Sequence, residues 1–341
     1  MPADGRGRVP AALQHATMRA MRMTPPPNPS ASPVPGTPAT LRRRPRRLGA
    51  LLLAGALVGG CASLDEKQRE WIFQPSERSW PGGLAAAEGM ADVFIDFGSR
   101  QTGQPVTLHG LWLAQPDPAA PVLLYLHGAR WDIRGSAQRM RRMHELGFSV
   151  LGVDYRGFGR STRVLPSETL ANEDARAAWD WLALQHPQAG RYLFGHSLGS
   201  AIAVQLASEV DDARGLMLEG AFPSMPELVS RFKWGWLPVA PLISQRFDAA
   251  ERIGQVRVPV LVVHGSDDAL IPPALGHALY ERAPEPKRWV LVQGGSHHNT
   301  NQLGQPQYRE AVAALFGVPA GHSAGQSAGG VELAARAPPG R

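Results

Sequence analysis

The chain has one cysteine in 341 residues, Cys61, which excludes an internal disulfide bond and leaves too few thiolates for a zinc site. It also lacks a basic folded region, although its formal net charge is +6. Residues 1–60 hold nine arginines, no lysine and one acidic residue, a net charge of +8. The remainder carries 26 basic and 28 acidic side chains, a net charge of −2. We therefore expect no nucleic-acid partner, because nothing in this part would neutralise a phosphate backbone.

Cofactor motifs are missing as well. Gly157-Phe158-Gly159 follows a strand-like run, but it lacks the third glycine and the later acidic residue of a dinucleotide fingerprint. The sequence also shows no cluster of metal ligands and no phosphate-binding loop. We expect neither a metal ion nor an organic cofactor.

The first 60 residues form a leader. A basic stretch, LRRRPRR, precedes the apolar run LGALLLAGALV at 48–58, which is shorter than the roughly 20 residues that span a bilayer. Small residues follow, and this order is typical of a signal peptide. Residues 58–61, Val-Gly-Gly-Cys, resemble the lipobox of bacterial lipoproteins. The resemblance implies that Cys61 is lipidated, with Ala62 directing the protein to the outer membrane, facing the periplasm; simple cleavage is the alternative.

The rest of the chain divides into three parts by composition. Residues 61–90 are polar with scattered aromatic side chains, and we expect a tether that ends by packing on the domain. Residues 91–317 form the predicted domain, and the hydrophobic content of 43% is enough for a buried core. Residues 318–341 are rich in alanine, glycine, serine and proline, which predicts a disordered tail.

Apolar runs of strand length alternate with helical patterns in the domain. The predicted strands are 92–97, 106–113, 122–127, 149–154, 191–196, 214–219, 258–265 and 289–294. The predicted helices between them are 134–147, 167–185, 198–210 and 272–283. Nearly continuous apolar runs are typical of strands buried on both faces. We expect a mostly parallel eight-stranded sheet with helices on both faces, its first two strands antiparallel because no long connection separates them.

The strongest motif is Gly195-His196-Ser197-Leu198-Gly199. It follows a predicted strand and precedes a predicted helix, the setting that a nucleophile elbow requires. A serine that simply caps the helix is the alternative. A nucleophilic serine needs a base and an orienting acid, which follow it in the order acid, then histidine, in this arrangement. Asp267 and Asp268 come just after one later strand, and His297 and His298 just after the next.

With these motifs the domain resembles the α/β-hydrolases, of the serine-aminopeptidase-like, single-domain esterase type. The resemblance covers about residues 64–315. It rests on His127-Gly128, the Asp154–Ser161 segment, the elbow, the His264–Pro272 segment and Gly294–His297. It implies an eight-stranded α/β-hydrolase fold with a short lid at 221–253.

The resemblance also assigns roles to residues. It favours Asp268 over Asp267 as the acid and His297 over His298 as the base, with Ser197 as nucleophile. Two oxyanion donors are implied, the main-chain N–H groups of Leu198 and Ala129.

Other polar residues near the strand ends have competing interpretations. Glu219 is a second candidate acid or an anchor for the lid, and Arg130 and Trp131 line the pocket mouth or remain at the surface. The histidines at strand ends are expected to bond the local backbone; they are His127, His196 and His264.

These residues predict a serine hydrolase that cleaves carboxylic esters or thioesters of a small acyl substrate through an acyl-enzyme on Ser197. Lid aromatic side chains suit an acyl or aromatic group but equally suit packing; they are Phe222, Phe232, Trp234, Trp236 and Phe247. Amide hydrolysis by the same triad is an alternative, although no acidic cluster is present to bind a peptide amine. A non-catalytic envelope lipoprotein on a hydrolase scaffold is the third possibility.

Overall fold

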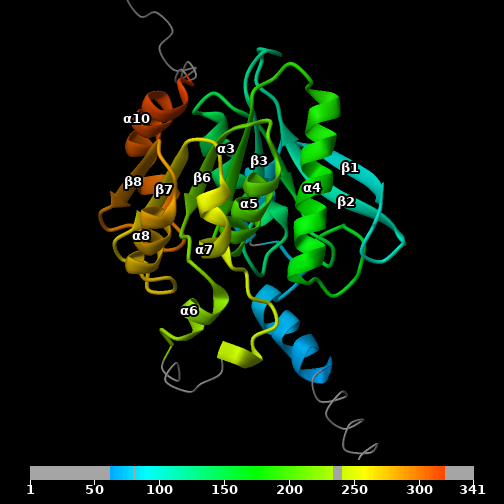
Figure 1. Cartoon of the computed structure of the whole chain (residues 1–341). Helices are drawn as coiled ribbons and strands as arrows, with labels where there is room; N and C mark the ends of the chain where they lie inside the picture. The colour runs from blue at the N-terminus through cyan, green and yellow to red at the C-terminus, as the bar shows by residue number, and fades with distance from the viewer. Residues whose placement is uncertain (1–61, 80, 233–239, 319–341) are drawn as a thin grey trace, which may run out of the picture. The chain divides into compact units, whose positions relative to one another are not determined.

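A computed structural model describes residues 62–79, 81–232 and 240–318 (Figure 1). The leader with Cys61, most of the predicted tail, and the lid residues Trp234, Trp236 and Leu237 lie outside the described residues. No helix among the described residues combines the length and apolar character needed to cross a membrane.

The domain is built on one eight-stranded sheet in the order β1-β2-β4-β3-β5-β6-β7-β8. β1 pairs antiparallel with β2, and β2 with β4, while all other neighbours are parallel. The strands are β1 Ala91–Gly98, β2 Pro105–Leu113, β3 Val122–Leu126, β4 Ser149–Val153, β5 Arg191–His196, β6 Ala213–Glu219, β7 Val260–Gly265 and β8 Lys287–Val292. This confirms the predicted fold class, including the antiparallel first pair.

Helices cover both faces of the sheet (Figure 1). A helix at 62–73 comes before α2. The others are α2 Pro81–Ala87, η1 Ile133–Ser136, α3 Ala137–His144, α4 Glu168–Gln185, α5 Leu198–Glu209, α6 Met225–Val229, η2 Ala240–Leu242, α7 Ala249–Arg252, η3 Ile253–Gln255, α8 Pro273–Arg282, α9 Thr300–Leu303 and α10 Gln305–Phe316. The four predicted helices all form, although the predicted 134–147 helix is a 3₁₀ turn followed by α3. Ser167 caps α4, since its hydroxyl accepts a hydrogen bond from the Leu170 N–H.

Alternation along the strands divides the core into two layers. In β3, Val122, Leu124 and Leu126 pack on one face with α4, α5 and α8, whereas Leu123 and Tyr125 pack on the other with α3 and α10. Side chains of a strand alternate between faces, so a run of five buried residues needs cover on both sides. This layering holds the carboxyl ends of the parallel strands at one edge, where ligands bind in open α/β sheets.

The segment before β1 is part of this packing. Phe73, at the end of the 62–73 helix, is fully buried and contacts the rings of Phe158 and Phe247. At the other end, Val318 is buried in the second core layer. Both contacts join residues that are distant from each other in the chain.

Candidate active site

Ser197 lies at the turn between β5 and α5, at the carboxyl end of the central parallel strands. Its backbone has φ 55° and ψ −122°, a conformation that non-glycine residues rarely adopt. The N–H of Ser197 donates to the carbonyl of Glu219 on β6, at 2.9 Å. The sharp turn lifts the side chain out of the sheet at the N-terminus of α5.

Two glycines make this turn sterically possible. A Cβ on Gly195 would lie 2.4 Å from the carbonyl oxygen of Gly199, and a Cβ on Gly199 would lie 2.1 Å from the carbonyl oxygen of Leu126. Both distances are far below van der Waals contact. The sequence G-x-S-x-G therefore reflects a physical need for close strand–helix approach at this site.

The structure brings the three predicted side chains into one hydrogen-bonded chain. The Ser197 hydroxyl donates to Nε2 of His297 at 3.0 Å, and Nδ1 of His297 donates to Oδ2 of Asp268 at 2.8 Å. Asp268 and His297 are buried, whereas Ser197 is partly exposed. Because the carboxylate accepts a hydrogen bond from Nδ1–H, the ring proton stays on Nδ1. Nε2 is then free to accept the hydroxyl proton of Ser197.

Asp268 is held in its charged form. Its Oδ1 accepts the N–H groups of Leu270 at 3.0 Å and Ile271 at 2.8 Å, and Nε2 of His264 lies 3.4 Å from Oδ2. Burial alone would raise the pKa of this carboxyl, but the hydrogen bonds from His264, His297 and Ile271 outweigh burial and lower the pKa well below its usual range. The acid therefore stays ionised at neutral pH.

The alternative candidates for the acid and the base do not contact the triad side chains in the way these roles require. Asp267 is exposed and accepts a hydrogen bond from the Ser266 hydroxyl, and His298 is exposed. Glu219 is buried, but its carboxylate binds Arg139 at 2.9 Å and the Tyr308 hydroxyl, and no contact to His297 is present among the described residues. Its role as a second acid finds no geometric support.

The three histidines at strand ends each contact a main-chain carbonyl, which is local for His127 and His264, as predicted, but lies 101 positions away for His196. His127 bonds Gly128 at 2.6 Å, His264 bonds Ile271 at 2.8 Å and His196 bonds His297 at 3.2 Å. Two of them nevertheless support the site, because His264 also contacts the acid and His196 fixes the backbone of the base. The sequence pattern gave no sign of the His196 contact, because its two residues lie 101 positions apart in the chain.

The loop after β3 lies against the nucleophile. A Cβ on Gly128 would lie 3.0 Å from Cβ of Ser197. Neither the Ala129 nor the Leu198 N–H has a hydrogen-bond acceptor among the described residues. Both backbone donors are thus available in the region where an oxyanion would form. Trp131 is half-exposed, and Arg130 makes no ion pair with another described residue.

Buried contacts hold this loop in place. The Arg130 N–H, at an unusual φ of 86°, donates to the Phe73 carbonyl at 2.9 Å. The Ile133 N–H donates to Oδ1 of Asp154 at 2.7 Å, and Oδ2 of Asp154 lies 3.1 Å from Nδ1 of His109.

His109 sits between two carboxylates, since its Nε2 also bonds Asp92 at 2.8 Å. Burial would lower the pKa of His109, but the hydrogen bonds to Asp154 and Asp92 outweigh burial and raise it. The imidazolium is therefore the stabilised form at this position.

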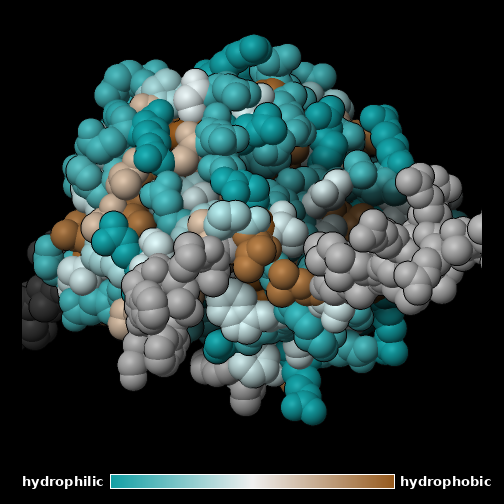
Figure 2. Space-filling view, turned by 60° about the horizontal axis from the view of Figure 1, so that its bottom comes forward, coloured by the Kyte–Doolittle hydropathy of each residue, from teal (hydrophilic) through white to brown (hydrophobic). Residues whose placement is uncertain are grey.

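The lid aromatic side chains divide into two groups. Phe222 and Phe247 are buried in the core, so for these two packing is their role. Phe232 is partly exposed and meets Trp71 of the 62–73 helix edge to face, with 6.4 Å between ring centres. The same helix bonds the lid through Gln68, which donates to the Leu242 carbonyl at 2.7 Å. Figure 2 shows apolar side chains on this side of the domain.

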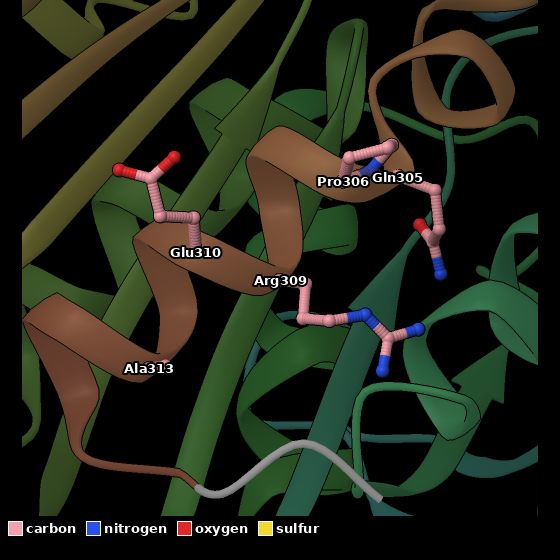
Figure 3. A pocket seen from close by; sticks show the side chains of 5 residues that line it. All are labelled: Gln305, Pro306, Arg309, Glu310 and Ala313. Atoms are coloured by element: carbon pink, nitrogen blue, oxygen red, sulfur yellow. The ribbon is translucent and has the colours of Figure 1, made fainter. Parts of the chain in front are cut away.

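A surface hollow elsewhere on the domain is unrelated to the triad. It runs along α10 and is lined by Gln305, Pro306, Arg309, Glu310 and Ala313, all on one helix (Figure 3). None of these side chains reaches the catalytic residues by a hydrogen bond. We assign it no function.

Comparison with known proteins extends these findings. A family described as serine aminopeptidase, S33, matches residues 117–249. An uncharacterized protein of Mycobacterium tuberculosis strain H37Rv is 35% identical over 241 residues, covering 70% of this chain and 83% of that protein. Lysophosphatidylserine lipase ABHD12 of Danio rerio is 33% identical over 187 residues, covering 49% of this chain and 48% of that protein, so the match spans about half of the lipase.

Solved structures share the fold at low sequence identity. The Pyrococcus furiosus esterase Pf2001 has a TM-score of 0.58 at 18% identity, covering 73% of this chain and 99% of that chain. Est1E from Butyrivibrio proteoclasticus has a TM-score of 0.53 at 18% identity, covering 66% of this chain and 99% of that chain. At this identity the likeness concerns the fold alone.

The fold, the hydrogen-bonded Ser197–His297–Asp268 geometry and the family match define an enzyme of the serine hydrolase class. The chain belongs to the α/β-hydrolase family.

Proposed function

We propose that the enzyme hydrolyses carboxylic esters or thioesters, with Ser197 as nucleophile, His297 as general base and Asp268 as orienting acid. The observation that carries the proposal is the continuous chain of hydrogen bonds from the Ser197 hydroxyl through His297 to Asp268, at 3.0 and 2.8 Å. A serine hydroxyl is a weak nucleophile without such a base.

The geometry supports acylation followed by deacylation. Oγ of Ser197 attacks the substrate carbonyl while Nε2 of His297 takes the hydroxyl proton. The negative oxygen of the tetrahedral intermediate accepts hydrogen bonds from the main-chain N–H groups of Ala129 and Leu198. His297 then returns the proton to the leaving alcohol or thiol, and Ser197 carries the acyl group. Water then attacks the acyl-enzyme while His297 takes a proton from the water. His297 returns that proton to Oγ of Ser197, which releases the carboxylic acid and restores the serine.

The test uses the full chain, purified in detergent, with p-nitrophenyl esters of increasing acyl length and a fluorophosphonate label. We expect turnover and labelling that both vanish in Ser197→Ala. Activity in Ser197→Ala at the wild-type level would refute the nucleophile, because this variant lacks the hydroxyl that forms the acyl-enzyme. Labelling without ester turnover would keep the nucleophile and move the substrate to amides or thioesters. Neither signal in a folded protein would favour a non-catalytic scaffold.

His297→Ala and His298→Ala form a matched pair for the base. The two residues are adjacent, but only His297 contacts Ser197. We expect His297→Ala to abolish labelling and His298→Ala to keep most of it. The reverse outcome would exchange their roles.

Within this reaction we propose a single-chain acyl ester as the substrate class. The Danio rerio relative is a lysophosphatidylserine lipase, and exposed apolar side chains gather on the lid and the adjoining helix; they are Leu64, Trp71, Phe232 and Leu242. Hydrolysis of lysophosphatidylserine, compared with its diacyl form and with a peptide nitroanilide, tests this. A preference for the nitroanilide would favour the amide alternative.

For the leader we propose acylation at Cys61 and anchoring to the cell envelope, on the outer membrane facing the periplasm. The basis is the resemblance of residues 58–61 to a lipobox, directly before the 62–73 helix. Expression with labelled palmitate should label the wild-type chain in the membrane fraction. An unlabelled wild-type chain, or labelling that persists in Cys61→Ser, would refute acylation at this residue.

A further inference from the structure

A buried ion pair stands beside the triad without taking part in its proton transfers. Nε of Arg139, on α3, donates to Oε1 of Glu219, at the end of β6, at 2.9 Å. Their side chains are 12% and 2% exposed, and the Tyr308 hydroxyl donates to the other carboxylate oxygen. Apolar replacements of buried ion pairs are often as stable, so stability alone is a weak explanation for two buried charges at this position.

The acidic member of the pair contacts the nucleophile. The Glu219 carbonyl accepts the Ser197 N–H at 2.9 Å, and Glu219 pairs with His196 in the β5–β6 ladder. Ser197 holds an unfavourable backbone conformation, which persists only where surrounding contacts impose it. The backbone of Glu219 is paired on both sides in the sheet, and its side chain links this acceptor to Arg139.

The basic member contacts the base. Nη2 of Arg139 donates to the carbonyls of His297 and His298, each at 3.0 Å. Both residues lie in the loop after β8, where no sheet hydrogen bonds hold the backbone. Nε2 of His196 supplies another bond to the His297 carbonyl at 3.2 Å. The planar guanidinium can bridge a carboxylate and two carbonyls at once, which a lysine ammonium cannot reproduce.

We propose that Arg139 and Glu219 are positioning residues that hold the nucleophile and the base in mutual register, Glu219 through the Ser197 N–H and Arg139 through the carbonyls of His297 and His298. This inference rests on the proposed function; Arg139 belongs to no motif in the sequence analysis, and Glu219 receives a role other than second acid or lid anchor. The pair ties α3, β6 and the loop after β8 together at the catalytic centre.

The ion pair of Arg139 and Glu219 also balances the charge beside His297. A lone cation beside His297 would disfavour the imidazolium that forms during acylation, and Glu219 offsets the charge of Arg139. The charged and titratable groups around His297 come from several elements; they are Asp268 and His264 from β7 and its loop, His196 from β5, Glu219 from β6, Arg139 from α3, His298 beside it, Tyr308 from α10, and Arg130 from the loop after β3. Among these groups, Arg139 and Glu219 form a salt bridge, so a neutral residue at position 219 leaves the positive charge of Arg139 uncompensated beside His297.

Two variants separate position from charge. Arg139→Lys keeps the charge but loses the bridge, and we expect kcat for p-nitrophenyl butyrate to fall about tenfold to a hundredfold with KM nearly unchanged, because small misplacements of reacting groups cost that much. Glu219→Gln keeps the shape but leaves Arg139 uncompensated. We expect the acid limb of kcat/KM to move to lower pH in that variant, because the uncompensated guanidinium of Arg139 repels positive charge on the imidazole of His297.

The matched control is Arg141→Lys. Arg141 lies on the same helix and also binds two main-chain carbonyls, those of Ala86 and Glu88, far from the triad. We expect activity close to wild type in this variant. Thermal unfolding of every variant identifies those that fail to fold, and Arg139→Lys is chosen because it leaves no buried charge unpaired.

The outcomes are distinct. A wild-type chain that neither turns over esters nor takes the fluorophosphonate label refutes the proposed function, and this inference with it. An active wild type with wild-type kcat in Arg139→Lys refutes the positioning role alone. A change confined to KM assigns Arg139 to substrate binding instead. An acid limb that stays in place in Glu219→Gln refutes the charge balance.

Discussion

Replacing Asp268 by asparagine should disable the enzyme by changing the tautomer of its base. In the native site Oδ1 of Asp268 accepts two main-chain N–H groups, from Leu270 and Ile271, and Oδ2 accepts Nδ1 of His297. An asparagine in the same pocket must present its oxygen to the two amides, which places its NH₂ group toward His297. Nδ1 then becomes the acceptor, and the proton moves to Nε2.

The consequence follows from the geometry at the nucleophile. A protonated Nε2 faces Oγ of Ser197 at 3.0 Å and cannot accept the hydroxyl proton. A wrong tautomer of this kind lowers kcat by about 10⁴-fold in a serine triad, which corresponds to about 5 kcal/mol of activation free energy. Substrate binding does not involve Asp268, so KM should change little.

The assay is steady-state hydrolysis of p-nitrophenyl butyrate together with the rate of fluorophosphonate labelling. Asp267→Asn is the matched control, because Asp267 is the adjacent acid and is exposed. A loss of less than tenfold in a folded Asp268→Asn variant, or a larger loss in Asp267→Asn, would refute the reasoning.

Further predictions concern the turn, the loop behind it and the stability of the acid. Gly199→Ala should abolish activity and lower the free energy of unfolding by about 1–3 kcal/mol, because its Cβ would meet the Leu126 carbonyl, while Gly98→Ala, with open space around it, should change neither in matched urea titrations. His109 has a raised pKa when folded, so its contribution to stability is present below about pH 6.5 and is lost as pH rises through the folded pKa. Urea unfolding should show a larger difference between wild type and His109→Gln at pH 5.5 than at pH 8.5, and an equal difference at both would contradict this. Asp268 has a lowered pKa, so the stability lost in Asp268→Asn should shrink as pH falls below about 4, which acid titration of both proteins would show.

The hydropathy pattern of the sequence was sufficient to predict the strands of the sheet and to narrow the catalytic candidates to a few residues. The eight strands form within a few residues of the predicted limits. The central ones, such as β3, β4 and β7, were the clearest in the sequence, because a strand buried on both faces is apolar along its whole length. Ser197 and the neighbouring pairs Asp267/Asp268 and His297/His298 were identified because they come shortly after strands, and parallel strands bring their carboxyl ends to one edge. Local sequence therefore carried both the fold class and the triad candidates.

Choices between neighbours needed the resemblance or the structure. Asp267 and Asp268 are chemically identical, and only the turn after β7 decides which one faces His297 and which one faces solvent. The helix at 62–73 was also missed as an element, because its stability comes from Phe73 packing against rings contributed by segments far along the chain.

The sequence by itself determined the strands, their alternation with helices and the small set of groups able to act as nucleophile, acid and base, since these depend on local periodicity and on the tight turn that glycine permits. Tertiary structure alone decided which neighbour faces the imidazole, which backbone N–H groups remain free near Ser197, and that Arg139 joins Glu219 to the carbonyls of His297 and His298. Those relations link residues 80 and 158 positions apart, and no local propensity reports contacts across such a separation.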